Sequence, residues 1–415
     1  MMKRLMSLLL ILMLLPATSP AAPILLLPQQ PGALAPISLA PDGQSGLYAA
    51  EGELMIVRTD GSVLPVTVSQ TRGAADTYGN LERIASMGLR AIGAEGLAWS
   101  PDGRYAALVN QNQVAIYAHF YYDPIVLDTH TGELFLAATY ENKATKENCG
   151  VVITACFSGD SRYLYAVILG RLNGKRFSLV QYDLETLEAV TLYACDKESP
   201  HYWPHLNQLR DGSFLLLTDQ TKQHLPTGIR RILPQGGEAA VTHADFILPS
   251  AYFYPRSLQY SRNSGYALIL ASSSVPSADS QSGMQTVYHF TRLMCLRPDE
   301  GELAKDEYWE IPSLDAEKVA VLTGNEAQSP SPVYLHSMCL SPDGERALIV
   351  CAAEKGEYAL RMLNLTDGSL TPVTGVDSDT LRSMCMAGTL YLDWTGDTIL
   401  LGKQGMVPLA YQIKE

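Results

Sequence analysis

Residues 338–350 read MCLSPDGERALIV, a short apolar stretch, a tight turn and a second apolar stretch. The same pattern occurs at 98–109 as AWSPDGRYAALV, and a looser copy, SLAPDG, begins at residue 38. Proline presets φ near about −65° in such a turn, aspartate hydrogen-bonds the local backbone, and glycine accepts positive φ where the chain reverses. Two apolar strands joined by this turn form a hairpin, and repetition of one hairpin at a long period indicates a repeat architecture.

Weaker copies of the hairpin divide the chain into seven units of four short strands each. The units start near residues 38, 97, 155, 206, 257, 337 and 384. Gly159 replaces the turn proline in the third unit, and the strand 383–386 is expected to open the seventh, because SMCM repeats the SMCL of 337–340. Between the first two units, Leu81 and Ile84 at helical spacing indicate a short helix or a loop insertion.

The runs WSPDGR at 99–104 and LSPDGE at 340–345 resemble the repeats of TolB-type, WD-like β-propellers. The resemblance implies a propeller fold and says almost nothing about function. We therefore predict an all-β chain that forms a β-propeller of seven four-stranded blades, with six or eight blades as alternatives. The segment 24–27 is expected to add an outer strand to the last blade.

The N-terminus has the pattern of an export signal. Lys3 and Arg4 precede the apolar run 5–15, and Ser19-Pro20-Ala21 is a small-residue cleavage site. The apolar run is too short to cross a bilayer core of about 30 Å. We predict a signal peptide at 1–21, a single propeller domain at 22–415, and a secreted or periplasmic protein without membrane insertion after cleavage. An uncleaved N-terminal anchor is the alternative.

The charge balance argues against some partners. The chain has a formal net charge of −13, which repels phosphate backbones and anionic lipid, so nucleic-acid binding is not expected. Its seven cysteines are an odd number, which leaves at least one thiol unpaired. Cys149 and Cys156 are the one close pair, and either a local disulfide or free thiols fit their spacing.

The sequence assigns no catalytic residue, metal ligand or cofactor. It contains no Gly-x-Ser-x-Gly motif of the kind found in α/β-hydrolases. His201 and His205 are the only close histidine pair, but Pro204 favours a loop without fixed ligand geometry. A further set of acids repeats with the turns, and we assign it a structural role because these turns favour such residues; the set is Asp42, Asp102, Asp160, Asp211 and Asp343.

Aromatic residues are the candidate ligand-binding class, because the chain has 22 tyrosines against 8 phenylalanines. Tyrosine combines a stacking face with a polar edge. We expect a subset to line one face of the disc and to stack on a glycan or an extended peptide, and it comprises Tyr121, Tyr122, Trp203, Tyr252 and Tyr254. The alternative is that these side chains are wedged between blades.

The function expected from these features is non-enzymatic binding, in which a rigid propeller presents loops to a protein or a cell-envelope glycan. The competing hypothesis is an enzyme of the central funnel, such as a glycan or lactone lyase or hydrolase. Such a site would be assembled across blades and would leave no local motif. An exported sensor propeller in a larger complex is a third possibility.

Overall fold

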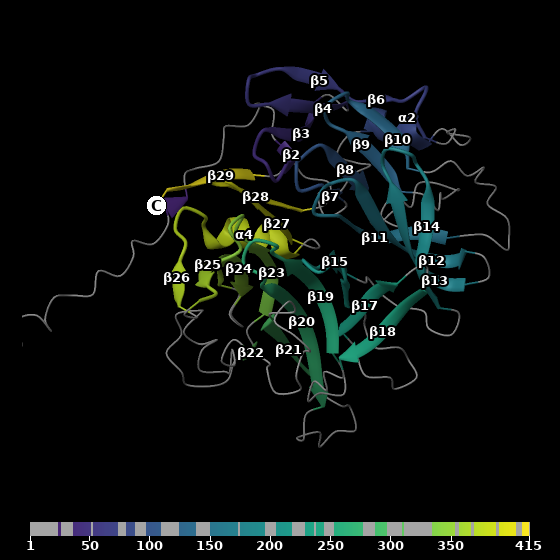
Figure 1. Ribbon diagram of the computed structural model, residues 1–415. Helices are drawn as coiled ribbons and strands as arrows, with labels where there is room; N and C mark the ends of the chain where they lie inside the picture. The colour runs from purple at the N-terminus through teal and green to yellow at the C-terminus, as the bar shows by residue number, and fades with distance from the viewer. Residues whose placement is uncertain are drawn as a thin grey trace, which may run out of the picture.

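The structure is a computed structural model of the 415-residue chain. The residues it describes are 24–25, 36–50, 53–73, 80–87, 97–108, 124–137, 150–172, 175–195, 205–217, 229–235, 238–244, 253–276, 287–296, 309–310, 334–352, 357–366, 369–386, 390–403 and 409–414. Their strands form seven sheets that follow one another around a ring (Figure 1). These sheets are the blades, numbered I to VII in chain order.

The first three blades are built from consecutive antiparallel strands. Blade I contains β2 (Pro36–Leu39), β3 (Ser45–Ala50), β4 (Glu53–Arg58) and β5 (Val63–Pro65). Blade II contains β7 (Leu97–Trp99), β8 (Tyr105–Leu108), β9 (Ile125–Asp128) and β10 (Glu133–Leu136). Blade III contains β11 (Gly150–Phe157), β12 (Tyr163–Leu172), β13 (Lys175–Asp183) and β14 (Ala189–Cys195).

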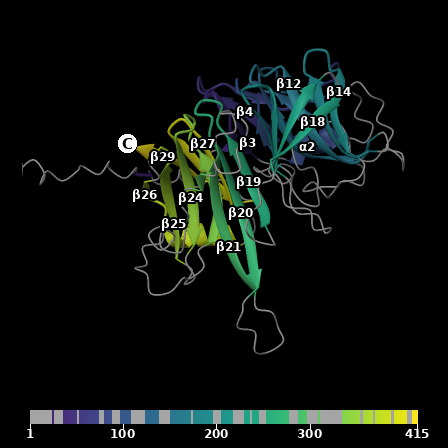
Figure 2. The same cartoon turned by 60° about the horizontal axis from the view of Figure 1, so that its bottom comes forward.

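The next three blades repeat this order. Blade IV contains β15 (His205–Gln208), β16 (Phe214–Leu217), β17 (Ile229–Gln235) and β18 (Glu238–Ala244). Blade V contains β19 (Phe253–Tyr260), β20 (Ala267–Pro276), β21 (Val287–Leu296) and β22 (Trp309–Glu310), and its long β20–β21 hairpin projects from the ring (Figure 2). Blade VI contains β23 (Tyr334–Leu340), β24 (Arg346–Ala352), β25 (Tyr358–Asn364) and β26 (Leu370–Pro372).

Blade VII joins the two ends of the chain. It contains β27 (Leu390–Thr395), β28 (Thr398–Lys403) and β29 (Leu409–Lys414), and β1 (Ile24–Leu25) pairs antiparallel with β29. The predicted N-terminal strand is therefore present, but it is the fourth strand of this blade rather than an extra one. The pairing matches Ile24 with Lys414 and Leu25 with Ile413.

The first strand of each blade lies on the inner side of the ring. β7, β11, β15, β19, β23 and β27 contact one another in chain order, and β27 contacts β2. A hydrogen bond of 2.8 Å from Trp99 Nε1 to Ser38 Oγ links β7 to β2. Radial repetition of this kind leaves only short sheet edges exposed.

The hydrophobic core is divided among the junctions between neighbouring blades. Between blades I and II, for example, Leu47 and Ile56 pack with Leu127 and Leu134, all within 3% of full burial. Burying one such side chain stabilises the fold by about 1.5–3 kcal/mol. The repeated apolar strands thus make each blade depend on its neighbours.

Two helices lie in the described part of the chain. α2 (Asn80–Met87) is a helix, one of the two alternatives expected there, and Leu81 and Ile84 bury its inner face against blades I and II. α4 (Ser378–Met386) overturns the strand predicted at 383–386. Asp377 caps α4 by accepting the Thr380 N–H at 2.8 Å, and Leu381, Met384 and Cys385 form its buried stripe.

The segment 63–69 is divided between two blades. β5 ends at Pro65, and β6 (Thr67–Val68) pairs parallel with β10 as a fifth strand of blade II. Val66 is buried at the crossing. None of the helices in the described residues is long and apolar enough to cross a membrane.

Candidate functional site

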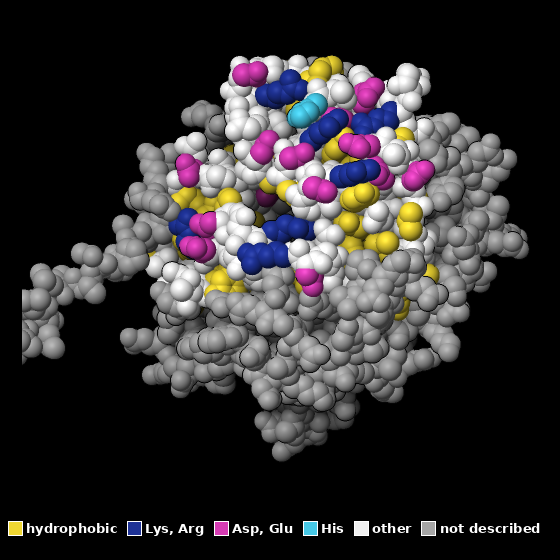
Figure 3. All heavy atoms as spheres, viewed as in Figure 1, with side chains coloured by type: hydrophobic (Ala, Val, Ile, Leu, Met, Phe, Trp, Pro, Cys, Tyr) yellow, Lys and Arg dark blue, Asp and Glu magenta, His cyan; other side chains and the backbone are white. Residues whose placement is uncertain are grey.

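The two ends of the ring carry different connections. Successive strands within each blade run antiparallel, so the turns from first to second strand and from third to fourth strand lie at one end. We call this end the turn face and the opposite end the loop face. On the face shown in Figure 3, basic and acidic side chains interleave rather than form separate patches.

The five predicted turn aspartates all make the same local bond. Each accepts, at Oδ1, the backbone N–H of the second residue after it; the donors are Gln44 (2.9 Å), Arg104 (3.0 Å), Arg162 (3.2 Å), Ser213 (2.9 Å) and Glu345 (2.9 Å). In four turns a serine hydroxyl donates to the same carboxylate, from Ser100 (2.6 Å), Ser158 (2.5 Å), Ser213 (2.5 Å) and Ser341. These carboxylates are therefore occupied inside their own turns.

In three of these turns the same bonds favour the ionised carboxylate. Burial would raise the pKa of Asp102 and of Asp343, but the serine hydroxyl and backbone N–H bonds outweigh it and lower both pKa values. The Ser158 hydroxyl is the largest influence on Asp160 and lowers its pKa. A carboxylate held in this way is a poor general acid near neutral pH.

Neighbouring turns also contact each other around the turn face. The Asp42 carboxylate packs on the backbone of Gly103, where an added Cβ would lie 2.6 Å from Asp42 Cγ. The Asp102 N–H donates to Ser161 Oγ at 3.2 Å, joining blades II and III. Asn263 Nδ2 donates to the Pro342 carbonyl at 3.1 Å, joining blades V and VI.

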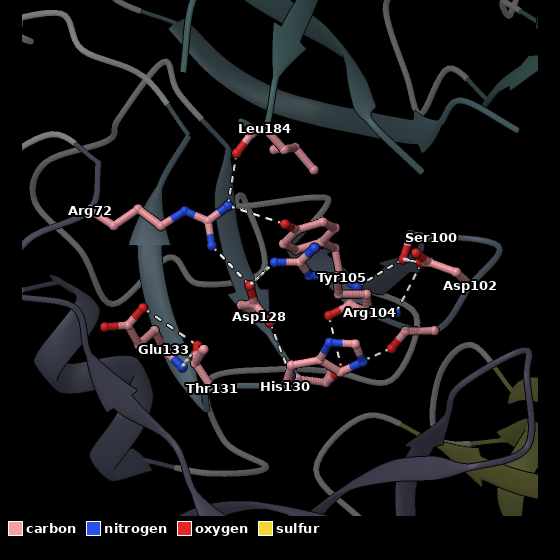
Figure 4. Close-up of polar contacts among 12 residues, drawn as sticks. Arg72, Ser100, Asp102, Arg104, Tyr105, Asp128, His130, Thr131, Glu133 and Leu184 are labelled. Atoms are coloured by element: carbon pink, nitrogen blue, oxygen red, sulfur yellow. Dashed lines mark hydrogen bonds and ion pairs between the residues drawn. The ribbon is translucent and has the colours of Figure 1, made fainter. Parts of the chain in front are cut away.

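A buried ion cluster lies behind the turns of blade II. Asp128 is fully buried, and its Oδ2 accepts from Arg72 Nη1 at 2.9 Å and from Arg104 Nη2 at 3.3 Å. Figure 4 shows the two arginines approaching this carboxylate from different sides. The other oxygen, Oδ1, accepts the His130 N–H at 3.0 Å.

Arg72 extends this cluster to the next blade. Its Nη2 donates to the Leu184 carbonyl of blade III at 2.8 Å and to Tyr105 Oη at 3.3 Å, as Figure 4 shows. The guanidinium also lies 4.0 Å from the ring centroid of Phe135, a favourable cation–π arrangement. Arg72 thus joins blades II and III.

Blade III repeats the pairing of an arginine after the turn with an aspartate that ends the third strand. Arg162 Nε and Nη2 donate to Asp183 Oδ2 at 3.1 and 2.8 Å. Sequence reasoning missed both pairs. A sequence signal for them exists. Arg104 and Arg162 each lie two residues after a turn aspartate, and their partners, Asp128 and Asp183, each end an apolar run about 20 residues later.

In blades III to VII, one side chain of the first strand faces the first strand of the next blade. The residues at this position are Cys156, Asn207, Gln259, Cys339 and Asp393. The Gln259 amide donates to the Met338 carbonyl at 3.2 Å and accepts the Leu340 N–H at 2.7 Å. Asn207 Nδ2 donates to the Leu258 carbonyl at 3.4 Å. These side chains satisfy backbone groups on the free inner edges, which otherwise need water.

Sulfur takes this position in blades III and VI. The backbone of Gln208 acts to lower the pKa of Cys156, and the backbone of Trp394 acts to lower that of Cys339, but burial outweighs both influences. Burial raises the pKa of Cys156 to about 12 and that of Cys339 well above its ordinary value. Both thiols are free and stay protonated, so they are poorly suited to act as nucleophiles.

Asp393 holds the same position where blade VII meets blade I. Its Oδ2 lies 3.3 Å from Ser38 Oγ and 3.5 Å from the Leu39 backbone nitrogen, which donate to it. Enclosure by these groups raises the pKa of Asp393, because burial outweighs the hydrogen bonds it accepts. The Trp99–Ser38 bond continues this contact into blade II.

The structure describes one of the five predicted aromatic residues. Tyr121, Tyr122, Trp203 and Tyr252 lie outside the described residues, and Tyr254 is the second residue of β19, where its backbone pairs with Ser272. The structure therefore leaves their ligand-binding role a prediction. Among the described tyrosines, Tyr105, Tyr165, Tyr182 and Tyr411 are buried.

The histidine pair is only partly described. His205 opens β15 and is half-buried, whereas His201 lies outside the described residues. The described part of the chain contains no group of three or more His, Cys, Asp or Glu side chains that could hold a metal ion.

Comparisons with known proteins identify the fold. No protein-family model and no curated protein matches the sequence. An oligogalacturonate lyase from Vibrio parahaemolyticus is similar in structure, with a TM-score of 0.54 at 12% identity, covering 94% of this chain and 96% of the lyase. The β-propeller domain of Cps50 (Swd1) from Myceliophteria thermophila gives 0.48 at 10% identity, covering 92% of this chain and 97% of that one. TolB from Acinetobacter baumannii gives 0.38 at 14% identity, covering 83% of this chain and 64% of TolB.

The fold is a TolB-like, WD-like β-propeller. The seven sheets and the Pro-Asp-Gly hairpins carry this conclusion, and the lyase supports it at the level of fold. Identities this low do not transfer an activity, because one fold hosts many functions.

Proposed function

We propose that this protein is an exported binding module that presents the loop face of its propeller to a protein or to a cell-envelope glycan. One observation carries the proposal: the described strands that flank the connections with Tyr121, Tyr122, Trp203 and Tyr252 end or begin at this face, and Tyr254 lies near the start of β19 at the same end. The turn face offers a contrast, since its carboxylates and several arginines are occupied by one another and by backbone groups.

The described strands define where these connections begin and end. The connection from β8 to β9 contains Tyr121 and Tyr122, and the connection from β14 to β15 contains Trp203. The connection from β18 to β19 contains Tyr252 and continues into Tyr254. Second-to-third strand connections and blade-to-blade connections share one end of an antiparallel propeller. On this proposal, aromatic residues from the connections of blades II to V serve one face.

Aromatic side chains on adjoining blades suit an extended ligand. Each ring offers an apolar face for a sugar or a peptide side chain, and tyrosine and tryptophan add a polar group at low conformational cost. The ring of interlocked blades supplies a rigid support, which reduces the ordering cost of binding.

Export is part of the proposal. The signal predicted at 1–21 lies outside the described residues, and we propose that cleavage leaves one propeller domain, 22–415. Support comes from β1, which begins at Ile24 and pairs with the C-terminal strand. N-terminal sequencing of protein recovered from the cell envelope tests it: a start near Ala22 supports cleavage, and an intact Met1 contradicts it.

The ligand hypothesis is tested by replacing Tyr121, Tyr122 and Trp203 together by alanine. The probes are immobilised envelope glycans and solubilised envelope proteins. The variant should lose capture and keep the wild-type melting temperature. A matched control replaces the exposed turn-face residues His130 and Glu185 by alanine and should retain capture.

Two results would contradict the binding hypothesis. A triple variant that melts several degrees lower and still captures ligand would show that these aromatic residues pack between blades. Release of shortened or unsaturated products from the glycan probe by the wild-type protein would support the enzyme alternative instead.

A further inference from the structure

Arg262 makes a contact between blades that are not neighbours. It lies in the turn between β19 and β20 of blade V, yet its Nη1 is 2.5 Å from the position that a Cβ on Gly159 of blade III would occupy. Blade IV separates these two blades along the ring. Both turns follow first strands, which lie on the inner side of the ring, and Arg262 also bonds to Gln208 at the end of the first strand of blade IV. Arg262 therefore lies on the inner part of the turn face.

The sequence of the blade III turn accommodates this arginine. Three other turns have proline at the position of Gly159, namely Pro41, Pro101 and Pro342. Any residue with a Cβ would collide with the guanidinium in its present place. The departure from the repeat at Gly159 thus has a specific structural effect, which is to leave room for Arg262.

A chain of neutral groups holds the guanidinium. Arg262 Nη2 donates to Gln208 Oε1 at 2.5 Å, and Gln208 Nε2 donates to Tyr165 Oη at 3.0 Å. Tyr165 packs edge-on against Phe214, with ring centroids 4.5 Å apart. Burial raises the pKa of Tyr165 to about 12, so the phenol is neutral at physiological pH.

No carboxylate among these neighbours forms an ion pair with Arg262. Arg72 and Arg104 share Asp128, and Arg162 pairs with Asp183, whereas Arg262 forms no ion pair within the described residues. The carboxylate beside Gly159, Asp160, is held by the Ser158 hydroxyl and the Arg162 N–H. A half-buried, pre-positioned guanidinium with free donors binds oxyanions strongly, because little ordering is required.

We propose that Arg262 is the centre of an anion-binding site on the inner part of the turn face, which takes one carboxylate, phosphate or sulfate group of a ligand. Gln208 and Tyr165 are positioning residues that hold the guanidinium. The site lies at the end of the ring opposite the loop face and does not depend on ligand binding there.

The test is calorimetric titration of the full mature chain with three probes: sodium glucuronate, N-acetylaspartate amide and inorganic phosphate, each against sodium chloride of equal ionic strength. At least one probe should bind the wild type. Arg262→Gln should weaken that binding about tenfold or more, the usual scale for a lost charge-assisted hydrogen bond. Arg162→Gln, which removes a carboxylate-paired arginine from the same face, should change it by less than about twofold.

Gly159→Ala is a second variant that tests the same site if Arg262→Gln does not fold. Gly159→Ala leaves Arg262 in the chain but places a Cβ against its guanidinium, and it should weaken the same probe. The responding probe identifies the source as a sugar acid, an acidic peptide or a phosphorylated ligand. The proposal is overturned if no probe binds the wild type beyond the chloride control, or if both variants bind as the wild type does.

Discussion

Asp128→Asn removes the one negative charge that two arginines share. Breaking a buried ion pair costs about 3–5 kcal/mol when the remaining charge stays buried. Here the Arg72 side chain is 22% exposed and that of Arg104 is 43% exposed, so solvent compensates part of the loss. Asparagine also keeps an oxygen for the His130 N–H. We therefore expect the free energy of unfolding to fall by about 2–3 kcal/mol.

Urea unfolding followed by tryptophan fluorescence measures this loss. Because Asp128 is fully buried, the loss should change little between low salt and about 1 M salt, where exposed pairs are screened. Asp60→Asn is the matched control, since Asp60 accepts the Ser62 N–H in an exposed turn at 2.8 Å. It should leave the unfolding midpoint nearly unchanged.

A double-variant cycle with Arg72→Met separates the ion pair from other effects. If the pair carries the stability, Arg72→Met and Asp128→Asn should be clearly non-additive. The reasoning is refuted if Asp128→Asn costs less than about 0.5 kcal/mol, or if the two losses simply add.

Three further predictions concern closure and the turns. Asp393→Asn should be more stable than the wild type at pH 7, because burial raises the pKa of Asp393 in the folded chain. The wild type therefore loses stability relative to the variant as the pH rises above 3.8, the ordinary pKa of aspartate. Denaturation curves that still differ below that pH would contradict this prediction. Gly103→Ala should lose more stability than Gly212→Ala, because both have positive φ but only Gly103 has a neighbouring carboxylate in the way; equal melting temperatures would contradict this. Deleting residues 24–25 should lower the melting temperature by several degrees, because blade VII then loses its outer strand, and an unchanged thermal scan would show that β1 does not contribute to closure.

The sequence predicts a structural element correctly where the interactions that form the element lie within a few residues of one another. The Pro-Asp-Gly hairpins could be predicted because turn geometry depends on the few residues within it. The same reasoning failed at 383–386, where SMCM resembles a strand but follows Asp377, an N-cap, and continues a helical stripe from Leu381. A short apolar run does not distinguish strand from helix by itself.

The candidate sites depend on contacts that sequence spacing does not reveal. Arg72 belongs to the connection after blade I, yet it bonds to Asp128 and Leu184 of the next two blades. Arg262 reaches Gly159, 103 positions earlier in the chain, because packing of the blades brings both turns together on the turn face. Only the departure of Gly159 from the turn proline was visible beforehand, and without the ring it had no interpretation.

Neighbouring residues are enough to specify the hairpins of each blade, because apolar strands and Asx turns have local causes. Packing of the blades sets the remaining features: which strand closes blade VII, which carboxylates pair with Arg72, Arg104 and Arg162, and that Arg262 has no ion pair among the described residues. These outcomes depend on distances across the ring, and those distances exist only once the blades have packed against one another.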